Sequence, residues 1–321
     1  MWILVAIEAY FINAGVYVAD KFLLSKKIHS SIAYAFYVGI WSVFNACLLF
    51  YKPWIPDPRE LTLDLLSGFL FLITLVFWYK ALHQSEASRV VPVVGALTPI
   101  FSLVFSFVFL GESLSGRQFF AFIILICGGV LISIKQTKVY LYQKVFNRIK
   151  EIGGDIFGEI PASSRPTSRF LVNSIASAIL FAAYYVLMKY IYAHQPFVGS
   201  FVYSRLGSFL GVILMLFVPD WRHLIVKQQK GAKTPKNMLF FLIVRLAAAA
   251  AFIMINIAIS LGNVAIVNAL QGAQYLFLFL IILLISAKFP KILNEQLGKG
   301  VFLQKLIGVV LVCMGLYMFI A

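Results

Sequence analysis

The side chains that could do chemistry in this sequence are polar groups placed inside long apolar runs. One run, 264–286, carries Asn268, Gln271 and Tyr275 at spacings of three and four residues, which places them on one face of a helix. Arg205 lies about two turns inside another run, too deep for its charge to reach the lipid headgroups easily. Polar groups at membrane depth usually face protein or a water-filled cavity. We therefore expect these residues to bind a polar solute, with hydrogen bonding between helices as the alternative.

Arg205 is the best single charged candidate for binding a solute. Its planar guanidinium group matches a carboxylate or phosphate. A structural ion pair with Glu8 or Asp20 is the competing interpretation.

Further candidates for a cavity lining are polar or aromatic residues of other apolar runs. Aromatic residues make up 16% of the chain, so a single ring is more often part of the core or the membrane interface than a ligand contact. The candidates are Asn13, Tyr17, Tyr37, Trp78, Thr98, Tyr203 and Asn256.

Nothing in the sequence indicates an enzyme or a metal site. The histidines, His29, His83, His194 and His223, lie in or near separate loops without metal-ligand spacing. No nucleophile elbow or phosphate-binding loop is present. We expect no cofactor and no nucleotide-driven activity.

The composition is that of an integral membrane protein. Hydrophobic residues make up 62% and charged residues only 12%, whereas about a quarter of a soluble domain is charged. The net charge of +15 comes from basic residues that flank apolar runs. This favours a role in membrane orientation and contact with anionic lipid of the cytoplasmic leaflet over binding of nucleic acid.

The apolar pattern predicts an all-α protein with ten transmembrane helices, each near the ~20 residues needed to cross a bilayer. The expected segments are 2–20, 31–51, 62–82, 89–111, 116–134, 169–191, 197–218, 237–261, 264–286 and 301–320. Pro99 lies inside the fourth segment, where we expect a break near a pathway.

The two halves of the chain resemble each other, which predicts a repeat of five helices over 1–134 and again over 169–321. An odd number of helices in each half inserts the second repeat with inverted topology. The matching positions are Tyr17 with Tyr185, Lys21 with Lys189, Gly39 with Gly207, Ala81 with Ala258, Gly95 with Gly272, Gln118 with Gln304 and Gly129 with Gly315.

The linker 135–168 between the halves is basic. Val139, Tyr142, Phe146 and Ile149 recur at spacings of three and four residues among lysines and arginines. This pattern predicts an amphipathic helix on an anionic membrane surface, and a regulatory docking site is the alternative.

The first half resembles an EamA-type domain, the five-helix repeat of the drug/metabolite transporter superfamily. The resemblance is carried by Pro99, Leu110-Gly111-Glu112, Leu114, Gln118 and Gly128-Gly129-Val130. It implies a secondary transporter that exports or exchanges a small organic metabolite by alternating access. The alternative is a non-transporting accessory or lipid-flipping membrane subunit.

Small multidrug members of the superfamily are similar in the first helix, where an acidic residue serves proton coupling. The corresponding position here is near Asn13, so the acid is missing. Glu8 is the substitute candidate for proton coupling.

Charge predicts the orientation in a cell membrane. Most lysines and arginines fall in loops on one side, against Lys52, Arg59, Arg117 and Lys189 on the other. The positive-inside rule makes the first side cytoplasmic and places both termini outside, whereas the resemblance implies termini inside. A homodimer is compatible with the sequence.

Overall fold

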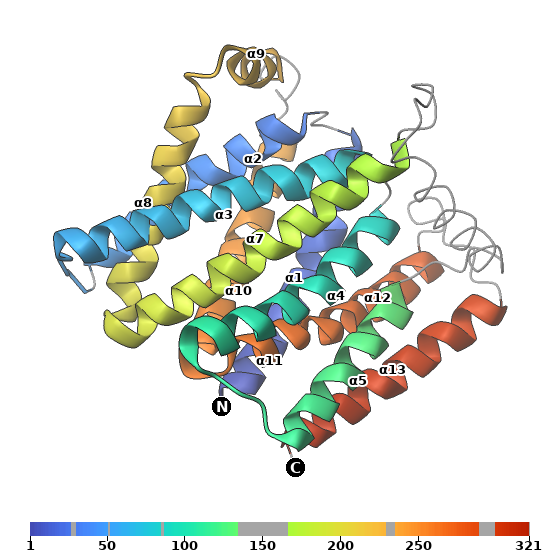
Figure 1. The fold of residues 1–321 in the computed structure, drawn as a ribbon. Helices are drawn as coiled ribbons and strands as arrows, with labels where there is room; N and C mark the ends of the chain where they lie inside the picture. Colours follow the sequence, from blue (N-terminus) through green and yellow to red (C-terminus); the bar gives the residue numbers. More distant parts are fainter. Residues whose placement is uncertain are drawn as a thin grey trace, which may run out of the picture.

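The computed structural model describes residues 1–26, 30–50, 52–84, 87–133, 166–228, 235–288 and 299–320, and their regular secondary structure is helical (Figure 1). The elements are α1 (Trp2–Lys26), α2 (Ser31–Ile40), the 3₁₀ helix η1 (Trp41–Phe50), α3 (Pro58–Gln84), α4 (Ala87–Phe105), the π-helical turn η2 (Ser106–Leu110), α5 (Gly116–Ser133), α7 (Pro166–His194), α8 (Phe197–Met215), α9 (Pro219–Gln228), α10 (Pro235–Leu261), α11 (Val264–Ala269), α12 (Gln271–Lys288) and α13 (Lys299–Ile320).

Each apolar segment expected from the sequence is helical. Within the described residues, eight helices are long and apolar enough to cross a membrane, and Gly116–Ile132 and Leu303–Phe319 are shorter apolar helices. The chain is therefore a multi-pass membrane protein.

The helical segments are not all uniform. The second changes from α to 3₁₀ geometry at Trp41, and the ninth is divided at Leu270. The break expected at Pro99 is absent, because α4 runs through that residue and becomes irregular only at η2. There the chain ends the helix at Gly111, whose φ of 66° is a left-handed conformation that favours glycine.

Helices from the two halves interleave. α3 packs against α7 and α8, α1 against α10 and α12, and α4 against α7 and α11. α5 and α13 run side by side (Figure 1). Both termini lie at the same end of the molecule, which agrees with the expectation that they share one side of the membrane.

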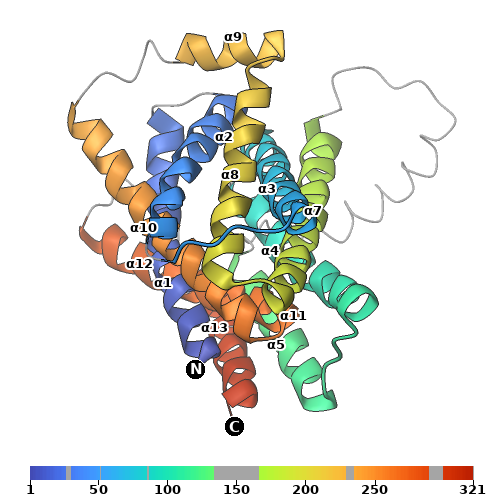
Figure 2. The same ribbon diagram turned by 90° about the vertical axis from the view of Figure 1, so that its left-hand side faces the viewer.

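The helix α9 was not expected, since its residues lie in a stretch assigned to a loop. It lies across the end of α8, away from the termini (Figure 2). Ile225 is buried and Trp221 packs against the core, so apolar contacts hold this short helix in place. The linker's predicted amphipathic segment lies outside the described residues.

Candidate functional site

The centre of the molecule contains aromatic side chains from both halves. Tyr17 of α1 lies edge-on to Trp78 of α3, with ring centroids 6.2 Å apart. Trp78 also contacts Phe181, which stacks on Tyr185 one turn further along α7 at 6.1 Å. Tyr17 lies within electrostatic range of both Tyr185 and Tyr275. We call these five residues the central aromatic cluster.

Arg205 lies beside this cluster and is only 4% exposed. Its Nη2 donates to the Tyr184 hydroxyl at 2.9 Å and to Ser204 Oγ at 3.3 Å. Its Cζ lies 4.3 Å from the ring centroid of Phe71 and 4.7 Å from that of Phe252. Cation–π contacts of this kind gain strength when they are desolvated, so the rings and hydroxyls together stabilise a buried guanidinium group.

The structure does not show the ion pair that the sequence suggested for Arg205. Among the described residues, Arg205 makes no ion pair with Glu8, and the side chain of Asp20 lies outside them. The Arg205 Nε has no hydrogen-bond partner within the described part of the chain. A donor group therefore remains unused on the best charged candidate.

Hydrogen bonds extend from Arg205 across four helices. Ser204 Oγ accepts from Ser67 Oγ of α3 at 2.8 Å. Asn256 of α10 is fully buried, accepts from the Tyr192 hydroxyl at 2.9 Å and donates to the Phe252 carbonyl oxygen at 2.9 Å. The polar network, as we use the term below, consists of Ser67, Tyr184, Tyr192, Ser204, Arg205 and Asn256.

The expected stripe on the ninth segment is crossed by the break at Leu270, yet two of its members face α4. Asn268 Nδ2 donates to Ser102 Oγ at 2.7 Å. The Tyr275 hydroxyl donates to the Val91 carbonyl oxygen at 3.2 Å. Gln271 is half-buried at the start of α12. The interhelical interpretation therefore describes Asn268 and Tyr275 in this conformation.

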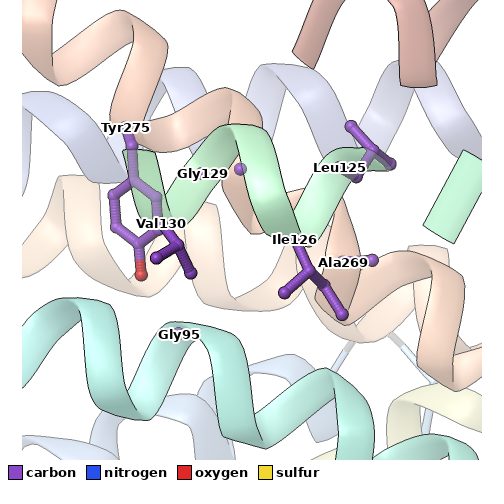
Figure 3. Close-up of a pocket in the computed structure, with 8 residues that line it drawn as sticks. Gly95, Leu125, Ile126, Gly129, Val130, Ala269 and Tyr275 are labelled. Atoms are coloured by element: carbon purple, nitrogen blue, oxygen red, sulfur yellow. The ribbon is translucent and has the colours of Figure 1, made fainter. Parts of the chain in front are cut away.

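A small pocket opens where α4 and α5 meet the break between α11 and α12 (Figure 3). Its lining is mostly apolar, and the Tyr275 hydroxyl points toward Gly95. A Cβ atom at Gly95 would overlap that hydroxyl oxygen. The enclosed space holds about one water molecule, so this pocket is too small for a drug-sized solute. Its lining residues are Gly95, Leu125, Ile126, Gly129, Val130, Ala269, Gly272 and Tyr275.

The other expected site residues are dispersed. Thr98 is 4% exposed, and its Oγ1 has no partner within the described residues. Tyr203 points away from Arg205 and donates to the Trp54 carbonyl oxygen at 3.1 Å, where the Trp54 ring also covers Gly199. Glu8 is exposed on α1, whereas Asn13 of α1 and Tyr37 of α2 are half-buried.

A charged cluster lies where α4, α7 and α10 end. Glu112 Oε2 accepts from Asn263 Nδ2 at 2.9 Å, and Glu112 Oε1 lies 4.0 Å from Lys189 Nζ. Lys189 also donates to the carbonyl oxygens of Ser260 and Gly262. Burial raises the pKa of Glu112, while Lys189 and the Val264 backbone N–H act in the opposite direction. These contacts hold Glu112 against the corner between α10 and α11.

Sequence analysis missed Tyr184, Tyr192, Asp64 and Gln195 as members of the polar region. Tyr185 matches Tyr17 in the repeat expected from the sequence, and this match could have drawn attention to the neighbouring Tyr184. Asp64 lies near the start of an expected segment, where a charge is ordinary, and Gln195 lies in a short corner. Only tertiary packing reveals that both are buried.

Comparison with known proteins finds a family match for the first part of the chain. Residues 1–134 match the EamA-like transporter family. This confirms the resemblance carried by Leu110-Gly111-Glu112 and Gly128-Gly129-Val130.

Individual proteins also resemble this chain, among them the following two. An uncharacterized protein of Methanocaldococcus jannaschii is 34% identical over 80 residues, which are 25% of this chain and 58% of that protein. A protein of known crystal structure is 14% identical with a TM-score of 0.65, over 99% of this chain and 94% of that one. The second likeness shows that the two proteins share a fold over nearly the whole chain.

Proposed function

We propose that this protein is a secondary transporter of the drug/metabolite type that exports or exchanges a small organic solute across the cytoplasmic membrane. The observation that carries the proposal is that Tyr17 and Tyr185 both lie in the central aromatic cluster, where Trp78 and Phe181 connect them. The two tyrosines occupy matching positions in an EamA-like domain and in the half that follows it. Substrate sites of inverted-repeat transporters lie at such an interface.

Helix packing supports an inverted repeat of ten membrane helices. We match α1 with α7, α3 with α10, α4 with α11 and α12, and α5 with α13. The α1–α10 contact then corresponds to α3–α7, and α1–α12 corresponds to α4–α7. Since α5 and α13 are matched with each other, exchanging the two halves leaves the α5–α13 contact unchanged. Alternating access follows if one repeat rocks against the other around the central aromatic cluster.

The side chains at the centre favour a solute with both a flat apolar part and a polar group. The rings of Trp78, Tyr17 and Tyr185 supply apolar faces. The unused Nε–H of Arg205 and the neighbouring hydroxyls supply hydrogen-bond donors. Amino acids, nucleoside-like compounds and drug-like compounds have this combination.

Binding is tested first, by thermal-shift screening of the purified protein against a metabolite library, because a ligand that binds the folded state raises its apparent stability. Arg205→Met and Gln271→Ala are expected to weaken the response to a hit. Tyr317→Phe is the control, since Tyr317 is 71% exposed on α13. A response that stays the same in both site variants would refute the proposed site.

Transport is tested with the same compound in liposomes. The proposal expects saturable flux that Arg205→Met and Gln271→Ala reduce and Tyr317→Phe retains. A protein that binds no library compound, moves no solute and co-purifies with a stoichiometric partner would instead be the accessory subunit considered above.

A further inference from the structure

An acidic residue is also buried in the membrane part of the fold. Asp64 lies in the second turn of α3 and is 0% exposed. Its helix belongs to the candidate membrane span Pro58–Leu82. No basic side chain of the described residues lies within 4 Å of its carboxylate. Burying an unpaired carboxylate ion costs free energy, and ionisable residues kept inside membranes are usually functional.

The partner that Asp64 has instead is an amide. Gln195 lies in the corner between α7 and α8, is 7% exposed and faces both carboxylate oxygens. With its nitrogen turned toward Asp64, the amide donates to Oδ1 and Oδ2 at 3.0 and 3.2 Å. With its oxygen turned toward Asp64, it can accept from a neutral carboxylic acid, because an amide carries donors on one side and an acceptor on the other.

The surroundings of Asp64 contain few other titratable or charged groups. On α3 itself, Glu60 lies one turn earlier and is within electrostatic range. From α7, Tyr192 is within electrostatic range of both Asp64 and Arg205. From α8, Arg205 is connected to α3 through the Ser67–Ser204 hydrogen bond. Asp64 is thus adjacent to the polar network without forming an ion pair in it.

We propose that Asp64 and Gln195 form a reversible proton-binding site within the membrane. A proton from the aqueous phase forms an O–H bond on a carboxylate oxygen, and the Gln195 amide turns by half a rotation to accept from it. Release of the proton reverses both changes, and no other bond forms or breaks.

The consequence for transport rests on the function proposed above. Because Gln195 joins α7 to α8 while Asp64 belongs to α3, the protonation state changes a contact between the two halves of the chain. Through Tyr192 and Ser67 this contact borders the site of Arg205. Proton binding at Asp64 would thereby couple solute movement to a proton gradient, a role that the sequence had assigned to Glu8.

The test is an infrared pH titration of the full-length protein in lipid, with the proton as the only ligand. A buried carboxylic acid has a carbonyl stretching band that disappears on ionisation. We expect the parent to show such a band and Asp64→Asn to lose it. Asp57→Asn is the matched control, because Asp57 is exposed just before the same helix, and Glu8→Gln tests the rival acid. Both controls are expected to keep the band.

Gln195→Leu provides the second measurement, because it keeps the acid and removes the amide. The band is expected to shift in frequency and in titration midpoint. A parent band that survives in Asp64→Asn, or is lost in Glu8→Gln, overturns the assignment of Asp64. An unchanged band in Gln195→Leu overturns the role of Gln195, and this result remains available if Asp64→Asn fails to fold. None of these results depends on finding a solute, so failure of the transport proposal is distinguished from failure of the proton site.

Discussion

The α3–α8 and α5–α13 contacts bring helix backbones together in the same way but carry different chemistry. Gly68 of α3 lies against the Ser204 carbonyl of α8, just as Gly128 of α5 lies against the Gly308 carbonyl of α13. Among the side chains that the structure describes, only the α3–α8 contact is accompanied by a series of buried hydroxyls, with Ser208 Oγ donating to the Gly68 carbonyl oxygen at 2.8 Å. At α5–α13, Gln304 Nε2 donates to the Leu131 carbonyl oxygen at 2.8 Å.

The difference shows that close packing does not require buried polar groups. Small residues alone allow helices to approach in a membrane, and an interhelical hydrogen bond adds typically ~0.6 kcal/mol. The hydroxyls at α3–α8, together with Arg205 and Asp64, exceed what packing requires. We therefore assign α5–α13 a structural role and the α3–α8 region the solute and proton chemistry proposed above.

The largest expected effect comes from adding a side chain at the centre of the α3–α8 contact. In Gly68→Val, the new Cβ would overlap the Ser204 carbonyl oxygen and lie 2.6 Å from the Ser208 nitrogen, so backbone must move. We expect a loss of more than about 3 kcal/mol in the free energy of unfolding, above the usual range for overpacking. Denaturant titration in detergent measures this. Gly15→Ala is the control, because a Cβ there meets nothing within 4 Å.

Gly128→Ala makes the corresponding change at α5–α13. Its Cβ would lie 2.8 Å from the Val312 nitrogen and 2.9 Å from the Gly308 oxygen, a smaller overlap than at Gly68. We expect a loss of about 1–3 kcal/mol in unfolding free energy, with solute binding retained by the folded fraction. Loss of binding at full stability would show that this contact also belongs to the site.

Glu112→Gln tests a charge outside both contacts. Burial raises the pKa of Glu112 above its ordinary value of 4.5, so the folded protein favours the protonated acid. Its stabilising contribution is full below the ordinary value and is lost as pH rises through the folded-state pKa. We expect the parent's thermal midpoint to fall across this pH window and the variant to respond less. Equal slopes for both proteins would contradict the assignment.

Ser204→Ala is expected to have the smallest effect on stability. It removes the hydrogen bonds that Ser204 Oγ accepts from Ser67 and, at a longer distance, from Arg205, and such a bond typically contributes ~0.6 kcal/mol. A double-mutant cycle with Ser67→Ala isolates the hydrogen bond from Ser67. A coupling energy much larger than ~0.6 kcal/mol would mean that the hydroxyls of α3–α8 are needed for packing after all, which would weaken the contrast with α5–α13.

The sequence predicts the helical segments well and the site only in part. Uninterrupted apolar runs specify helices because the bilayer leaves backbone groups no other partners. The irregularities at η2 and Leu270 depend on local contacts between side chains and backbone. The spacing of apolar residues in the sequence does not predict such contacts. Arg205 and Asn256 were expected from their depth and do share one network. Tyr203 has the same apparent depth but turns toward Trp54, because it lies early in α8.

Two of the five tryptophans provide the protein with optical reporters. A Cβ at Gly262 would lie 2.5 Å from the Trp2 indole, and one at Gly199 would overlap the Trp54 indole. Each indole therefore covers a corner between helices, beside Lys189 in one case and Tyr203 in the other. Indole fluorescence moves to longer wavelengths in water. Opening of either corner would therefore shift the emission maximum to longer wavelengths. With Trp41, Trp78 and Trp221 replaced by phenylalanine, the fluorescence would report on these corners alone, without an attached dye.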